Sequence, residues 1–135
     1  MTGIGPSRLQ HEQTCWLATV RPDGRAHLSP IWFVWLRDAF WMCCNSDTVK
    51  AHNMRANPQV AISLESGSDP VVVEGRAELH ARPYADDVTT AFQTKFDWNI
   101  SGTVPDPDGD FDVLVQVRPT KWVMGRPDSS DIGSS

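Results

Sequence analysis

Three basic side chains stand close together in the segment NSDTVKAHNMRANPQ, residues 45–59. They are Lys50, His52 and Arg55, in a chain whose net charge is −5. A positive cluster in an acidic protein indicates a local site for an anion such as a phosphate. The net negative charge argues against a nucleic-acid partner, because that binding neutralises many phosphates over a broad basic surface. The same pattern also fits a short helix whose charged face is simply solvated.

The segment is predicted to form a helix over residues 47–56, since polar capping residues precede it and an Asn-Pro pair follows it. Ser46 or Asp47 is expected to be the N-cap. The first turn of a helix has free backbone N–H groups and the positive end of the helix dipole, which together attract anions. Lys50 lies one turn into the helix, and Ser46 and Thr48 bring hydroxyl groups to its start. We therefore expect the anion at this N-terminus.

The basic residues do not share one face of this helix. At about 100° per residue, Lys50 and Asn53 lie on the same face, whereas Arg55 lies about 140° away from Lys50. One phosphate cannot easily contact both Lys50 and Arg55. Asn53 is therefore expected to orient Lys50 or to cap a neighbouring loop, and an ion pair or a subunit contact is expected for Arg55.

Other chemistries lack the residue patterns that they need. Cys15, Cys43 and Cys44 form no Cys-x-x-Cys pair, so neither a disulfide framework nor a zinc site is expected. Cys43 and Cys44 are adjacent in a predicted strand and should point to opposite faces. There is no Gly-x-Gly-x-x-Gly motif and no P-loop. The N-terminus is not a signal peptide and no run approaches the ~20 apolar residues that span a bilayer, so a cytoplasmic protein without a membrane partner is expected.

Short apolar runs separated by turn residues predict a mainly β fold. A small antiparallel β-barrel with two inserted helices is expected, because closure hides the sheet edges and no βαβ series is present. One domain is predicted over residues 1–127, followed by a disordered tail over 128–135. The predicted strands are 14–20, 26–36, 40–45, 59–65, 70–80 and 111–125 (the last a pair or one bent strand); a second helix is predicted over 83–96 and a loop over 97–110.

Two residues mark special positions in these strands. Pro30 removes a backbone donor from the strand over 26–36, so it is expected at a sheet edge, at a bulge or at a ligand-facing position. Gly75, in the strand over 70–80, is expected to mark a bulge or a close approach of another backbone.

A resemblance to a known family runs through most of residues 14–125. It is carried, in this order, by LATVRPDGRAHLSPIWFVWL, FWMCCNSDTVKAHNMRANPQVAIS, VVVEGRAEL and VRPTKWV. The most specific part is K-x-x-N-x-R-x-N-P-x-V after a strand, and the closing V-R-P-T-K strengthens it. These segments resemble the flavin/deazaflavin oxidoreductase superfamily, the split β-barrel proteins related to pyridoxamine 5'-phosphate oxidase. The most similar branch uses the deazaflavin coenzyme F420 or FMN.

The resemblance implies a homodimer with the cofactor in a groove between the two subunits. The helix segment would hold the cofactor phosphate, and the strand with Pro30 would run along the ring system. A residue near the C-terminal end would reach the cofactor of the partner subunit. The residues implied at the cofactor are Lys50, Ser46, Thr48, Asn53, Pro30, Ile31, Trp32 and Trp122.

Several of these roles have alternatives. Trp32 would otherwise be a core residue, and Trp122 would otherwise pack in a dimer interface. Trp98 would either line the substrate side or anchor its loop. Related sequences often carry a second basic residue at the positions of Thr48 and His52, and this chain has neither Arg nor Lys there.

The implied activity is that of an oxidoreductase in which reduced F420 passes a hydride to a small conjugated organic substrate. FMN in place of F420 is the alternative cofactor. Two non-catalytic alternatives are a cofactor carrier and a barrel that only mediates interactions in a dimer. Because the cofactor supplies the chemistry, no catalytic residue and no metal ligand are assigned.

Overall fold

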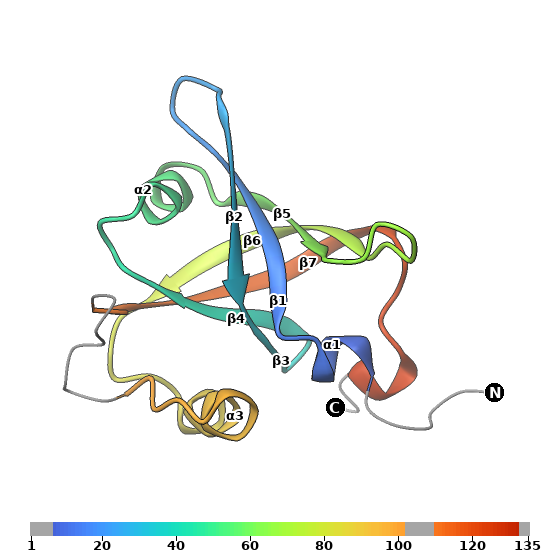
Figure 1. The fold of residues 1–135 in the computed structure, drawn as a ribbon. Helices are drawn as coiled ribbons and strands as arrows, with labels where there is room; N and C mark the ends of the chain where they lie inside the picture. Colours follow the sequence, from blue (N-terminus) through green and yellow to red (C-terminus); the bar gives the residue numbers. More distant parts are fainter. Residues whose placement is uncertain (1–6, 102–109, 133–135) are drawn as a thin grey trace.

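The computed structural model describes residues 7–101 and 110–132, and most of them belong to a seven-stranded antiparallel sheet (Figure 1). Its strand order is β2-β1-β5-β6-β7-β4-β3. The two end strands, β2 and β3, are consecutive in the chain, so the sheet curls round and closes on itself. The predicted small antiparallel barrel is confirmed. The elements are α1 (Arg8–His11), β1 (Thr14–Val20), β2 (Ala26–Trp32), β3 (Val34–Leu36), β4 (Ala39–Cys44), α2 (Val49–Ala56), β5 (Gln59–Leu64), β6 (Val72–His80), α3 (Asp86–Phe96), β7 (Val113–Met124) and η1 (Ser129–Asp131).

The predicted strand over 26–36 is divided in two, because the chain changes its pairing partner at Phe33. Before this residue β2 pairs with β1, and after it β3 pairs with β4. Phe33 itself donates its backbone N–H to the Gln13 carbonyl over 3.1 Å, and its side chain is completely buried. Since the residues on both sides of Phe33 are apolar, the sequence pattern does not reveal the break.

Both special strand positions are as predicted. Pro30 lies in β2, an edge strand, where a missing backbone donor leaves no ladder bond broken. The pairing of β6 with β7 shifts register next to Gly75. A Cβ atom on Gly75 would lie 2.7 Å from Val117 Cγ1 and 2.8 Å from the Arg118 carbonyl oxygen, so only glycine fits there.

Helix α2 has Thr48 as its N-cap, not Ser46 or Asp47. The Thr48 hydroxyl accepts a hydrogen bond from the Ala51 N–H over 3.4 Å. The Ser46 hydroxyl is not available for capping, because it donates to the Asp112 carboxylate over 2.8 Å. A contact between segments far apart in the sequence therefore moves the helix start.

The helix predicted over 83–96 begins at Asp86 instead. Tyr84, which precedes it, turns inward: its ring is buried and its hydroxyl donates to the Phe111 carbonyl over 3.1 Å. Residues 102–109 of the predicted loop lie outside the described residues.

The two ends of the described chain pack against each other, and residues 128–132 of the predicted tail take part in this contact. Turn η1 brings Asp131 under α1, where this residue is only 5% exposed. The Asp131 carboxylate accepts a hydrogen bond from the Ser7 hydroxyl, and its carbonyl accepts one from the Trp35 indole over 2.7 Å. The last three residues of the tail lie outside the described part.

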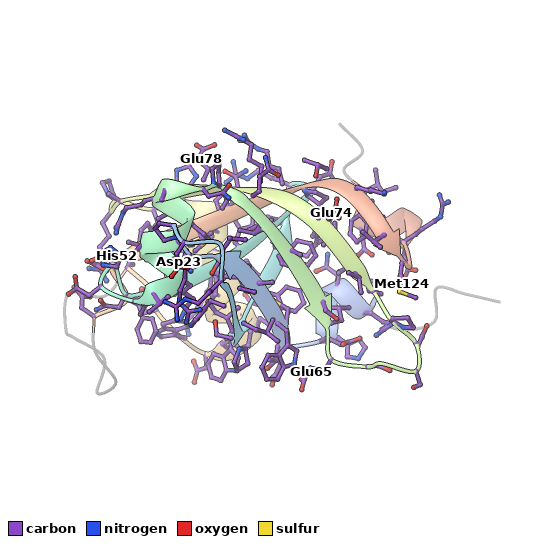
Figure 2. All side chains as sticks on the ribbon, turned by 90° about the horizontal axis from the view of Figure 1, so that it is seen from above. Asp23, His52, Glu65, Glu74, Glu78 and Met124 are labelled. Atoms are coloured by element: carbon purple, nitrogen blue, oxygen red, sulfur yellow. The ribbon has the colours of Figure 1, made fainter. Side chains whose placement is uncertain are left out.

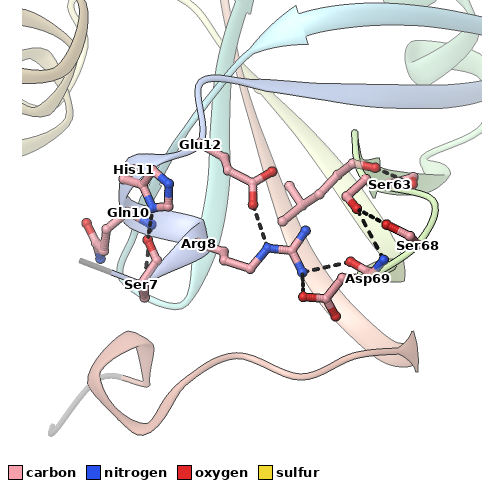
Figure 3. Close-up of polar contacts among 10 residues, drawn as sticks. Ser7, Arg8, Gln10, His11, Glu12, Ser63, Ser68 and Asp69 are labelled. Carbon is pink, nitrogen blue, oxygen red and sulfur yellow. Dashed lines mark hydrogen bonds and ion pairs between the residues drawn. The ribbon is translucent and has the colours of Figure 1, made fainter. Parts of the chain in front are cut away.

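Helix α1, which no sequence pattern predicts, is held by polar contacts (Figure 3). Ser7 caps it by accepting the Gln10 N–H over 3.2 Å. The Arg8 guanidinium lies 2.6 Å from the Glu12 carboxylate and 3.2 Å from that of Asp69. These ion pairs tie the start of β1 to the turn that follows β5.

Apolar side chains form two cores, one inside the barrel and one between the sheet and α3 (Figure 1). All six residues of β4 are buried, because α3 covers the outer face of this strand. As predicted, Cys44 and Cys43 point to opposite faces, the first into the barrel and the second toward α3. Within the described ranges, no helix has the length and apolar character needed to cross a membrane.

Candidate functional site

A cavity of about 670 Å³ opens between β2, the end of β4, the start of α2 and the end of α3. Its volume is in the range of small-molecule and cofactor pockets, ~300–1,000 Å³. Several separate elements of the chain supply its walls, so the site exists only in the folded barrel. The lining residues are Thr14, Pro30, Ile31, Trp32, Cys43, Cys44, Asn45, Thr48, Lys50, Phe96, Asp97, Trp98, Asp110 and Phe111.

One end of the cavity is basic. Lys50 lines it, and its amine makes no hydrogen bond or ion pair with the residues that the structure describes. The Thr48 hydroxyl, also in the lining, donates to the Asn45 carbonyl over 2.8 Å. Because the first turn of α2 also presents its backbone N–H groups here, this end can receive an anion.

A polar network holds this basic end in place from behind. Asp112 accepts hydrogen bonds from both the N–H and the hydroxyl of Ser46, each over 2.8 Å. Burial alone would raise the pKa of Asp112, but the bonds from Ser46 lower it below the ordinary value. Arg55 donates to the Ser46 carbonyl over 3.0 Å, and the Asn45 amide donates to the Asp110 carbonyl over 2.6 Å. With the described residues Arg55 thus makes a backbone contact and no ion pair, and the alternative subunit contact stays a prediction.

The other end of the cavity is aromatic. The ring of Trp32 stacks on Phe96 with centroids 4.6 Å apart and an angle of 5° between the planes. Trp98 meets Trp32 edge-on at 6.1 Å and Phe111 edge-on at 5.2 Å. Trp32 is 48% exposed, so part of its ring remains open to a ligand. This wall offers flat apolar surface to a planar molecule.

Lys95 lies behind the aromatic wall and does not line the cavity. Its ammonium donates to the Phe33 carbonyl over 2.9 Å and lies 4.2 Å from the centre of the Phe33 ring. Burial lowers the pKa of Lys95 from 10.5 to about 8. The neighbouring Cys15 and Glu12 act in the opposite direction but do not compensate for the burial.

The free energy of unfolding is expected to rise with pH above about 8 because of Lys95. Between about pH 8 and 10.5 the unfolded chain holds a proton at Lys95 that the folded protein lacks, so the slope with pH is positive. Buried thiols lower the free energy of unfolding as the pH rises above about 9. The reason is that burial raises the pKa of Cys15 to about 12, so the folded protein keeps a proton that the unfolded chain loses. Urea unfolding at a series of pH values should show that the free energy of unfolding of the wild type rises with pH relative to that of Lys95→Met. If the free energies of the two proteins changed with pH in parallel, this prediction would be wrong.

The thiols in the lining are not nucleophiles. Burial raises the pKa of both Cys43 and Cys44, so each thiol stays protonated at neutral pH. No set of three His, Cys, Asp or Glu side chains among residues 7–101 and 110–132 is placed to hold a metal ion. The cavity is therefore equipped to bind a ligand rather than to attack one.

The cavity brings together five of the eight residues predicted at the cofactor. These five are Pro30, Ile31, Trp32, Thr48 and Lys50.

The other three predicted residues lie elsewhere. Ser46 is engaged by Asp112, as described above. Asn53 is 2% exposed and donates to the Thr19 hydroxyl over 3.0 Å, so it faces the barrel rather than the Lys50 amine. Trp122 packs against Trp35, with centroids 6.0 Å apart, at the inner core. Within a single subunit it is not among the residues that line the cavity.

The sequence predicts only part of the aromatic wall. Trp98 is expected to line the substrate side or to anchor its loop, and it does both: it lines the cavity and packs against Phe92 and Phe111. No role is predicted for Phe96. The sequence feature that could have indicated one is an aromatic residue at the last position of a helix, where the chain leaves the core.

Comparisons with known proteins agree with this architecture. A family model described as pyridoxamine 5'-phosphate oxidase matches residues 7–123. The chain is similar to a solved structure described as an F420 reductase, with 26% identity over 88% of this chain and 97% of that one and a TM-score of 0.65. No curated protein matches the chain.

Two further solved structures share the fold at lower identity. One is HutZ, a heme storage protein from Vibrio cholerae, with 21% identity, a TM-score of 0.70 and coverage of 84% of this chain and 85% of that one. The other is an FAD-binding protein from Mesorhizobium loti, with 22% identity, a TM-score of 0.61 and coverage of 84% and 85%. Below 25% identity such likenesses concern the fold alone.

Proposed function

Because the chain belongs to the pyridoxamine 5'-phosphate oxidase-like family, we propose that its cavity binds the deazaflavin F420 and that the protein is an F420-dependent oxidoreductase. The observation that carries this proposal is that one cavity combines the Lys50 amine, which has no partner among residues 7–101 and 110–132, with the aromatic wall at Trp32. A molecule with a planar ring and an anionic tail matches both ends.

The residues present fit such a cofactor. The amine of Lys50 and the first turn of α2 would take the phosphate, with the Thr48 hydroxyl beside them. The edge strand β2 would lie along the ring, since Pro30, Ile31 and Trp32 are consecutive in the lining. The volume of about 670 Å³ accommodates a ring system and leaves room for a small substrate.

When bound and reduced, the deazaflavin would supply a hydride to an electron-poor carbon of a conjugated substrate, and solvent would supply the balancing proton. The chain's own residues would bind, orient and exclude water. Lys50 neutralises the anion, Trp32 and Trp98 cover the flat surface of the ligands, and the protonated Cys43 and Cys44 add apolar lining. No residue of the described chain is assigned as an acid or base.

The preference for F420 over FMN is supported by the 26% identity to the structure described as an F420 reductase. Lys50 at the basic end would also suit the compact phosphate of FMN. Purified protein should therefore be titrated with both cofactors, with absorbance and fluorescence as readouts. We expect tighter binding of F420, and oxidation of reduced F420 on addition of a conjugated acceptor. Binding without any turnover would favour a carrier, and binding of neither cofactor would leave only an interaction module.

We also propose a homodimer formed through the outer face of the β1–β2 hairpin. The cross-strand pairs on this face are apolar: Trp16 with Pro30, Ala18 with Leu28, and Val20 with Ala26. Leu28 is 61% exposed and Trp16 is 36% exposed, which is unusual for such side chains in a monomer. At its end this row reaches Pro30, which also lines the cavity, so a partner seated there would border the ligand.

Replacing Leu28 by glutamate is expected to convert the dimer into a monomer, because the charge would be buried without a partner in the interface. Light scattering after size exclusion measures the mass directly. The matched control is Ile132→Glu, which places the same charge at another exposed apolar residue, 57% exposed at the C-terminal turn. A Leu28→Glu protein that stays dimeric at micromolar concentration would exclude this face.

Figure 2 shows that the tip of the β1–β2 hairpin, marked by Asp23, lies at the same end of the molecule as His52 of α2. By contrast, Glu74 and Glu78 lie on β6. There Glu78 pairs with Arg118 over 3.3 Å. In the sheet order β5 separates this charged surface of β6 and β7 from the apolar face of the hairpin.

A further inference from the structure

The last turn of α3 contacts two consecutive residues at the break between β2 and β3. Lys95 donates to the Phe33 carbonyl over 2.9 Å, and the next residue, Phe96, stacks on Trp32 at 4.6 Å. The two contacting residues of α3 are consecutive in the chain, and so are the two residues that they contact. The hydrogen bond therefore fixes the same stretch of backbone that carries the stacked pair.

Phe33 needs such a partner, because it belongs to neither strand ladder. Its N–H reaches the Gln13 carbonyl over 3.1 Å, but its own carbonyl lies between the end of β2 and the start of β3. A buried carbonyl without a donor is costly. Lys95 satisfies this carbonyl, and its ammonium also lies 4.2 Å from the Phe33 ring centre, a favourable cation–π position.

Lys95 does not form a structural ion pair with the titratable groups that face it. Cys15 of β1 and Glu12 of the preceding segment are the titratable groups that face it. Burial raises the pKa of Cys15 to about 12, so its thiol is neutral, and the Glu12 carboxylate lies 2.6 Å from Arg8 (Figure 3). Burial lowers the pKa of Lys95 itself to about 8, so its charge is unfavourable there. A methionine would fill the same space without that cost.

We propose that Lys95 is a positioning residue that fixes the aromatic wall of the cavity and thereby sets its affinity for a flat ring, without touching the ligand. The proposal rests on the proposed function, since it takes the ring of a flavin or deazaflavin as the occupant of that wall. Lys95 acts through Phe33 on Trp32 and through its own helix turn on Phe96. When the Lys95 side chain is removed, the rings of Trp32 and Phe96 become more mobile, and a ligand must then order them on binding.

The test separates ring binding from phosphate binding. The probes are FMN with riboflavin, its phosphate-free form, and F420 with its phosphate-free deazaflavin chromophore. Lys95→Met is expected to weaken both members of a pair by about tenfold, so that their affinity ratio is unchanged. Lys50→Ala should weaken only the phosphorylated member. Lys95→Arg, which keeps a donor, should restore most of the affinity. Unchanged affinity of Lys95→Met in a wild type that does bind would overturn the proposal.

A second readout needs no ligand. The indole N–H resonance of Trp32, identified by its loss in Trp32→Phe, is followed by NMR as the pH is raised. Because the hydrogen bond to Phe33 weakens when Lys95 loses its charge, the resonance should titrate near pH 8 in the wild type and not in Lys95→Met. The same titration in both proteins would overturn the proposal. If the wild type binds no probe, the proposed function fails, and this measurement still decides the role of Lys95.

Discussion

Replacing Lys50 by alanine is expected to lower the affinity for F420, and for FMN, by at least about tenfold, or ~1.5 kcal/mol. The Lys50 amine lines the cavity and has no partner among the described residues, so its charge is available to the ligand. It belongs to the first turn of α2, whose backbone N–H groups would bind the same anion. Fluorescence titration of the two proteins with each cofactor measures the loss.

The control is Lys121→Ala, which removes the same charge from an exposed position on β7. It should leave both affinities within about twofold of the wild type, because Lys121 does not line the cavity and exposed charges are screened at physiological salt. The salt dependence of binding should also become shallower in Lys50→Ala. Equal affinities for wild type and Lys50→Ala would show that the start of α2 is not the phosphate site.

Replacing Phe92 by alanine is expected to destabilise the protein by about 3–5 kcal/mol. Phe92 has no exposed surface and lies in the core between α3 and the outer face of the sheet. Its ring also contacts Phe96 at 6.0 Å and Trp98 at 5.7 Å. Because a domain of this size is stable by only ~5–15 kcal/mol, the loss should be large in urea unfolding. The slope of the free energy of unfolding against urea concentration should be unchanged, because the fold itself is unchanged.

The matched control is Phe96→Ala in the same helix. Phe96 is half-buried, and it lines the cavity, so its removal should cost less stability but should weaken binding of the ring. The two variants therefore separate anchoring of α3 from formation of the aromatic wall. If Phe92→Ala cost less stability than Phe96→Ala, the packing of α3 on the sheet would be different from that described.

The start of α2 is the part of the cavity lining that the sequence predicts best. A helix start is a local feature: polar residues, a lysine one turn later and an Asn-Pro end define it within about 14 residues. Even so, the N-cap is Thr48 rather than Ser46, because Asp112 binds the Ser46 hydroxyl. Asn53 was placed beside Lys50 from helical periodicity, but its bond to Thr19 turns it toward the barrel. Both errors come from partners that are distant in the sequence.

The sequence by itself determined the β-barrel, the position of α2 and the special places of Pro30 and Gly75. Each follows from a local rule, such as alternation of apolar residues, a missing N–H or a missing Cβ. Only the tertiary structure decided the break at Phe33 and the aromatic wall. Trp32 and Phe96 are 64 positions apart in the chain and meet only because α3 packs on β3 and β4. Such contacts depend on how side chains from remote segments fill shared space, and no local pattern records that.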